Sequence, residues 1–88
     1  MLFMDVVTWK PENRDEVEKR AMEWKCPEEI TQRGYWVDLT GRKVFYLYET
    51  DDPEAILESN HYWTDLVKID TFQVMEINDI MEFMQKKS

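Results

Sequence analysis

The chain has 88 residues, enough for one small domain, and its formal net charge is −8, from 19 acidic and 11 basic side chains. Folding alone would bury only about 60 to 65% of the surface that the unfolded chain exposes, so a deep private pocket is hard to build. The negative charge disfavours nucleic acid as a partner, because the chain as a whole repels a phosphate backbone.

Compartment and cofactors are constrained by the same composition. The sequence contains no apolar run near the roughly 20 residues that a bilayer span requires, and its start, MLFMDVV, lacks the basic region and cleavage pattern of a signal peptide. Cys26 is the one cysteine, so an intrachain disulfide and a thiolate metal cluster are both excluded. We therefore expect a cytoplasmic protein with no membrane partner, no metal and no cofactor.

A strand is predicted at the start of the chain. Residues 2–9, LFMDVVTW, are apolar on both alternating faces, with Asp5 as the exception. A strand that is apolar on both faces is covered above and below, so we place it in the middle of a sheet. Pro11 has no backbone N–H to donate and ends the pairing.

A helix is predicted next, from about Arg14 to Lys25. Asn13 and Glu16 have the spacing of a capping box, in which each side chain accepts a hydrogen bond from a free backbone N–H at the helix start. Pro27 ends the helix. Its inner face carries three apolar residues at helical spacing: Val17, Ala21 and Trp24.

Two strands joined by a tight turn follow. Residues 30–39 alternate between an apolar face and a mixed face, which is typical of a strand with one face well buried. The turn is Thr40-Gly41, because Gly41 can take the positive φ of a tight reversal. The segment from Gly41 to Pro53, GRKVFYLYETDDP, holds this turn, a strand of nine residues that is apolar on both faces, and a helix start. The second strand is therefore also predicted to be interior.

The second helix is predicted from Glu54 to about Asn60. Asp52 is a favoured N-cap and Pro53 suits the first turn. The next residues, His61-Tyr62-Trp63, either extend this helix or form a separate turn.

The last third of the chain predicts a fourth strand over residues 66–77, whose mixed polarity is typical of a sheet edge. Asn78 is then predicted to cap a short final helix. Because this helix has no place in a four-stranded unit, we expect it to contact a neighbour or cover an opening. Its apolar stripe is Ile80, Phe83 and Met84.

The predicted order is strand, helix, strand, strand, helix, strand and a final helix. This is the α+β class, with the ferredoxin-like βαββαβ arrangement: a four-stranded antiparallel sheet, two helices on one face and an extra C-terminal helix. Right-handed crossovers leave the other sheet face open, and here that face is largely apolar. We therefore predict a homodimer through the open face, with about 800 Å² buried on each partner.

Three stretches carry a resemblance: LFMDVVTWKPENRDEV, GYWVDLTGRKVFYLYETDDPEAI and WTDLVKIDTFQVMEI. They resemble a short prokaryotic family of domains of unknown function, similar in fold to the dimeric α+β barrel superfamily. That superfamily includes cofactor-free monooxygenases of antibiotic biosynthesis and muconolactone isomerases. The resemblance implies the fold and a homodimer. It implies no reaction and no catalytic residue, because no motif of the monooxygenases matches here at a defined position.

His61 is the one histidine and the first candidate for proton chemistry. It either serves as a general base at the mouth of a cleft or is a partly exposed residue near a helix end, and we favour the second interpretation. Trp36 and Asp38 form the second candidate. They either hold an aromatic or cationic ligand, or Trp36 belongs to an interface and Asp38 pairs with Arg33 or Arg42, which we again favour.

Tyr46 and Tyr48 share one face of the predicted interior strand. They either line a pocket or pack with their hydroxyls at a dimer seam, and we favour the seam. An acidic cluster lacks the spacing of a calcium loop and is interpreted as a solvated helix start: Asp51, Asp52, Glu54 and Glu58.

Three classes of function remain. The first is a small dimer that binds an apolar or aromatic molecule in a cleft between sheet and helices, gated by the last helix. The second is a cofactor-independent enzyme of the monooxygenase or isomerase kind. The third is an interaction module without a pocket. A buried titratable group in a real cavity would favour the enzyme, and a filled core would favour the module. An aromatic cavity with no activated acid or base would favour the binding protein. We rank binding first and assign no catalytic residue. The candidate ligand-binding residues are Trp36, Asp38, Tyr46, Tyr48, His61 and Trp63.

Overall fold

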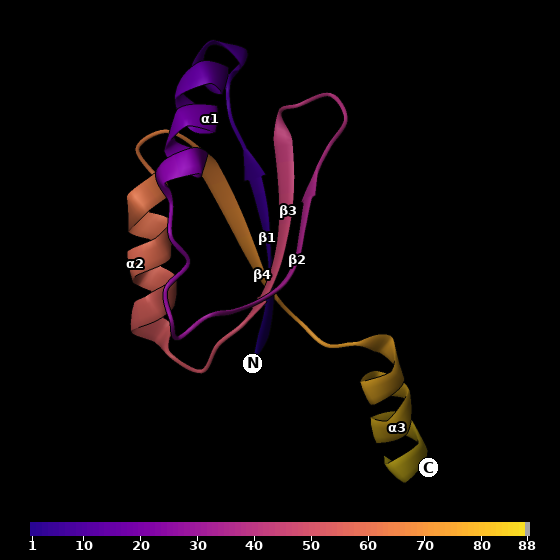
Figure 1. Ribbon diagram of the computed structural model, residues 1–88. Coiled ribbons are helices and arrows are strands. Elements are labelled where there is room, and N and C mark those ends of the chain that lie inside the picture. Colours follow the sequence, from indigo (N-terminus) through magenta and orange to yellow (C-terminus); the bar gives the residue numbers. More distant parts are fainter. Residues whose placement is uncertain (88) are drawn as a thin grey trace.

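Residues 1–87 are described by a computed structural model, and they form four strands and three α-helices (Figure 1). A short 3-10 helix, η1, precedes the first α-helix. In chain order the elements are β1 (Leu2–Thr8), η1 (Pro11–Asn13), α1 (Arg14–Glu23), β2 (Thr31–Val37), β3 (Lys43–Glu49), α2 (Pro53–Trp63), β4 (Lys68–Val74) and α3 (Ile77–Lys87).

The strands form one antiparallel sheet in the order β2-β3-β1-β4, with α1 and α2 on the same side of it (Figure 1). This is the predicted ferredoxin-like arrangement, and the two strands that are apolar on both faces, β1 and β3, are the central ones. The pairing places Asp5 of β1 opposite Tyr46 of β3 and Thr71 of β4. The charged residue of the first strand therefore lies in the middle of the sheet.

The core lies on the helix-covered face. Alternate residues of β3 are buried there, among them Tyr46 and Tyr48. They pack with Ile30 and with Ala55 of α2. Successive residues of a strand point to opposite faces, so by the cross-strand register the residues between these buried positions lie on the open face in every strand.

The open face is apolar over its central strands. Trp36 of β2 lies on this face opposite Phe45 of β3, and 53% of its surface is exposed. Its ring lies over Gly34. A Cβ atom at Gly34 would come within 2.2 Å of that ring, so only glycine leaves room for it. The other apolar residues of this face are Leu2, Met4, Val6, Leu47, Phe72 and Val74.

The ends of several elements differ from the predicted ones. β2 ends at Val37 because the hairpin loop begins with Asp38, whose carbonyl accepts the Gly41 N–H at 2.7 Å. Gly41 has the expected positive φ, +79°. The second helix does extend through Trp63, and the predicted cap holds, since the Asp52 carboxylate accepts the Glu54 N–H at 3.0 Å.

Two predicted caps are wrong. Asn13 makes no capping-box bond, because its side chain instead donates to the carbonyl of Leu66 at 3.4 Å, beyond the end of α2. Asn78 does not cap α3 either, since α3 begins at Ile77. Glu76 serves there, with its carboxylate accepting the Asn78 N–H at 2.8 Å.

The final helix, α3, stands apart from the sheet and from α1 and α2 (Figure 1). None of its residues is buried, and Phe83 and Met84 of its apolar stripe are each more than half exposed. Within residues 1–87, none of the helices is long and apolar enough to cross a membrane.

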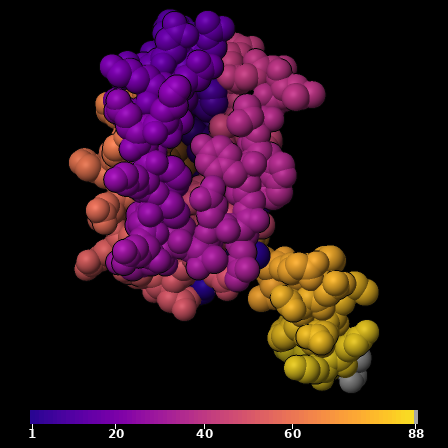
Figure 2. All heavy atoms as spheres, viewed as in Figure 1, coloured from indigo at the N-terminus to yellow at the C-terminus, as the bar shows by residue number. Residues whose placement is uncertain are grey.

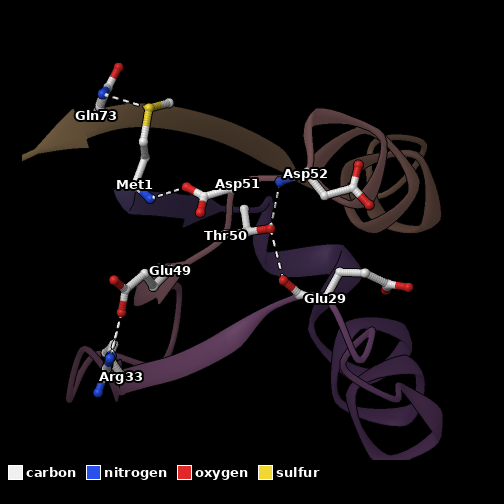
Figure 3. A network of polar contacts seen from close by, with 8 residues as sticks. All are labelled: Met1, Glu29, Arg33, Glu49, Thr50, Asp51, Asp52 and Gln73. Atoms are coloured by element: carbon white, nitrogen blue, oxygen red, sulfur yellow. Dashed lines mark hydrogen bonds and ion pairs between the residues drawn. The ribbon is translucent and has the colours of Figure 1, made fainter.

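One end of the sheet is fastened by the buried hydroxyl of Thr50 (Figure 3). This hydroxyl donates to the carbonyl of Glu29 at 2.8 Å and accepts the N–H of Asp52 at 3.1 Å. The backbone N–H of Thr50 donates to the carbonyl of Met1 at 2.9 Å. Thr50 thus joins the loop before β2, the start of β1 and the N-cap of α2.

We predict that Thr50→Val lowers the free energy of unfolding by about 1–3 kcal/mol, because it leaves two backbone groups without their hydrogen-bond partner. Thr50→Ser is the matched control, since it keeps the hydroxyl and loses one methyl group. Urea unfolding at equal protein concentration measures both. A Thr50→Val variant as stable as Thr50→Ser would contradict this account.

Candidate functional site

A pocket of about 260 Å³ lies between the helix-covered face of the sheet and the helices α1 and α2. Figure 2 shows a groove on one face of the molecule between α1 (purple) and the β2–β3 hairpin (magenta), with indigo atoms from the start of the chain at its bottom. The helices contribute Val17, Ala21, Ser59 and Asn60 to the lining, and the strands contribute Val7, Val44 and Ile69.

Five aromatic side chains line this pocket. The ring of Tyr46 lies at its centre, 5.8 Å from the ring of Trp24 in an edge-on contact and 5.4 Å from the ring of Tyr35. Trp24 in turn contacts Trp63 of α2 at 6.5 Å, again edge-on. The fifth is Trp9, just beyond β1. The ring contacts join four of these side chains, Tyr35, Tyr46, Trp24 and Trp63, into a continuous aromatic wall, which suits a flat apolar molecule.

Asp5 is the buried acidic residue of this pocket. Asp5 is 5% exposed. Its Oδ1 atom accepts hydrogen bonds from the hydroxyl of Thr71 at 2.7 Å and from the hydroxyl of Tyr48 at 3.2 Å. Both donors come from the neighbouring strands, as the register requires. A carboxylate is therefore held in a largely apolar pocket by two neutral hydroxyl groups.

Burial controls the protonation of the polar groups here. It raises the pKa of Asp5, and the two hydrogen bonds, which act in the opposite direction, do not offset it. Burial also raises the pKa values of Tyr46 and Tyr48, and the Asp5 charge acts on both in the same direction. Both phenols therefore stay protonated at neutral pH, where they act as hydrogen-bond donors rather than as bases.

The structure brings some of the predicted residues together and separates others. Tyr46 and Trp63 line the pocket, and Tyr48 reaches it through Asp5. Both tyrosines face the helices, so the interpretation that we favoured, with their hydroxyls at a seam on the open face, is wrong. Trp36 lies on the opposite face of the sheet, away from the pocket.

Asp38 and His61 also lie outside the aromatic pocket. Asp38 follows β2 in the hairpin loop, where a hydrogen bond from the Thr40 hydroxyl lowers its pKa. The expected pairing of Asp38 with Arg33 or Arg42 is wrong. Arg33 pairs with Glu49 at 2.5 Å, and within residues 1–87 no ion pair joins Asp38 to Arg42. His61 is exposed in the last turn of α2.

Sequence reasoning missed the buried acid. The available signal was that Asp5 is the one charged residue in a strand otherwise apolar on both faces, which requires a buried partner for it. Trp9, Trp24 and Tyr35 were also not among the candidates. Within residues 1–87, no group of three or more His, Cys, Asp and Glu side chains is placed to hold a metal ion. No residue of α3 lines the pocket, so the proposed gate does not form within one chain.

One protein family matches the chain. Its family model covers residues 1–88, and the family is described as a domain of unknown function (DUF3303). No curated protein matches the sequence. The functional argument therefore proceeds from the pocket itself.

We predict that Asp5 makes stability depend on pH in a defined direction. Its pKa is raised from the ordinary value of 3.8, so above pH 3.8 the native protein keeps a proton that the unfolded chain releases. The unfolding free energy of the wild type, relative to that of Asp5→Asn, should therefore fall as the pH rises above 3.8. The fall is about 1.4 kcal/mol for each pH unit over which the native carboxyl stays protonated.

Denaturant unfolding of both proteins between pH 4 and pH 7 measures this difference. Asp15→Asn makes the same substitution at an exposed position of α1, outside the pocket and the open face, and serves as the control. A difference between wild type and Asp5→Asn that stays constant or grows with pH would show that Asp5 is not a buried, costly charge.

Proposed function

The chain belongs to the DUF3303 family, whose function is unknown, and we propose from its pocket that it binds a small, largely apolar aromatic molecule between the sheet and the helices. The observation that carries this proposal is the continuous aromatic wall of the pocket. Pockets lined mainly by apolar and aromatic side chains, with a few placed polar groups, are the usual form of small-molecule sites.

The arrangement of the pocket favours a flat ligand. Trp24 and Trp63 approach from the helix side, while Tyr35 and Tyr46 belong to the sheet. A flat ring that lies against this wall would bury one face on aromatic surface, and apolar burial contributes about 25 cal/mol for each Å² removed from water. A filled core would have favoured the interaction module, so the open pocket argues against that class.

A cofactor-independent enzyme of the monooxygenase or isomerase kind is the second candidate. Asp5 supports it, because a titratable group with a raised pKa inside a cavity is what proton transfer requires. In this alternative Asp5 takes a proton from an acidic C–H or O–H group of the substrate, and the hydroxyls of Tyr48 and Thr71 orient its carboxylate.

We also propose that the functional unit is a homodimer, as the resemblance to dimeric α+β barrels implies. The apolar open face supports this, because it includes side chains as exposed as Trp36 and Phe72, at 53% and 54%. A second copy that covers the central strands would bury about 800 Å² per partner, the size of a standard stable interface. The exposed apolar stripe of α3 adds to the surface that a second copy can cover.

We predict that filling the pocket abolishes ligand binding. Indole serves as a neutral aromatic probe, and a ¹H–¹⁵N NMR titration should shift the side-chain N–H signals of Trp24 and Trp63. Ala21→Phe places a ring in the pocket from α1 and should remove these shifts. Met22→Phe is the matched control, because Met22 is the next residue of α1 and is 83% exposed. This variant should bind indole as the wild type does.

Equal titrations of the two variants, or no shifts in the wild type, would refute binding in this pocket. The same sample distinguishes the two candidate functions for any ligand that native mass spectrometry identifies on the purified protein. Recovery of that ligand unchanged after prolonged incubation supports binding, and its conversion supports the enzyme.

We predict that Leu47→Glu weakens or abolishes the dimer, because it places a charge in the middle of the open face. Light scattering after size-exclusion chromatography should give twice the chain mass for the wild type and a single chain mass for this variant at low micromolar concentration. Leu57→Glu is the matched control on α2, where Leu57 is 70% exposed, and should remain dimeric. A monomeric wild type would overturn the dimer.

A further inference from the structure

The pocket has a charge asymmetry that the proposed function leaves unexplained. Its lining contains two carboxylates, Asp5 and Glu18, but no Lys, Arg or His from residues 1–87. The chain as a whole carries a net charge of −8. An anionic ligand would bring like charge into a poorly hydrated space, which is costly, whereas a cationic ligand would be attracted.

Asp5 is built to accept a further donor. Its present partners, Tyr48 and Thr71, are neutral hydroxyls that both bind Oδ1. A hydrogen-bond donor on a ligand would bind the second carboxylate oxygen, Oδ2. If that donor were an ammonium group, it would also neutralise the buried charge, and charge-assisted hydrogen bonds are roughly twice as strong as neutral ones.

The aromatic wall supplies a second means of recognising a cation. Tyr46 of β3 lies opposite Asp5 of the neighbouring strand β1, and its ring contacts both Tyr35 and Trp24. The faces of tyrosine and tryptophan rings attract cations, by about 0.5–1 kcal/mol at exposed sites and more where water is excluded. The carboxylate and the rings therefore favour the same kind of ligand.

We propose that this pocket selects a small aromatic amine, protonated at neutral pH, whose ammonium group pairs with Asp5 and whose ring lies against Trp24 and Tyr46. This inference rests on the proposed binding function and narrows the class of ligand. The ring accounts for the apolar wall, and the ammonium group accounts for the buried carboxylate and the absence of basic lining residues within residues 1–87.

Three probes of nearly equal shape and different charge test this selection at pH 7: 2-phenylethylamine, 2-phenylethanol and phenylacetate. Isothermal titration calorimetry should give the amine at least tenfold tighter binding than the alcohol, and no measurable binding of phenylacetate. Asp5→Asn should remove the preference, so that the amine and the alcohol bind with similar affinity. Asp15→Asn, the same substitution at an exposed position of α1 outside the pocket lining, should keep the full preference.

The outcomes separate the two proposals. If the alcohol binds as tightly as the amine, the aromatic site stands and the selection of a cation is wrong. The same conclusion follows if Asp5→Asn keeps the preference for the amine. If none of the three probes binds, and indole does not bind, both proposals fail. The wild-type series decides the charge preference by itself, so the test does not depend on whether Asp5→Asn folds.

Discussion

The buried carboxylate of Asp5 is the constraint on which the arrangement of the sheet and the pocket depends. It lies on the central strand β1 and is held by Tyr48 of β3 and Thr71 of β4, so it links three adjacent strands. A charge in such a place is costly unless it is hydrogen-bonded, and two hydroxyl donors supply only part of what water would. The pKa of Asp5 is raised because the two hydrogen bonds do not offset the loss of hydration.

A purely structural role explains this arrangement poorly. A valine or isoleucine at the position of Asp5 would suit a strand covered on both faces and would need no donors. The strand instead carries a carboxylate, and the surrounding rings leave a pocket beside it rather than closing over it. A local departure from the rules of stable packing, with open space beside it, is expected at a functional site.

The sequence contained enough to predict the sheet but not which of its faces would be functional. Strand order followed from the two runs that are apolar on both sides, and the turn at Gly41 and the cap at Asp52 followed from local chemistry. Alternation alone could not say which face the helices cover, because both faces of β1 and β3 are apolar. Trp36 was therefore considered for the site, although Tyr35, one residue earlier, is the one that lines the pocket.

The predicted cap at Asn13 was wrong for a related reason. Asn13 and Glu16 have the spacing of a capping box, yet Asn13 bonds to Leu66, which is far away in the sequence. Tertiary contacts of this kind cannot be inferred from spacing, and neither can the bond that places Arg33 on Glu49 instead of Asp38. The acidic residue that mattered most was visible in the sequence, but its importance depended on the register that sets Thr71 and Tyr48 beside it.

The two candidate functions make opposite demands on Asp5. A bound ammonium group stabilises the carboxylate and lowers its pKa toward the ordinary value, so the residue becomes a weaker base. Proton abstraction requires the reverse: a neutral substrate that leaves the raised pKa intact until the proton moves. The charge of the natural ligand therefore decides the chemistry as well as the affinity. A cationic ligand makes the pocket a binding site, and only a neutral one leaves Asp5 available as a base.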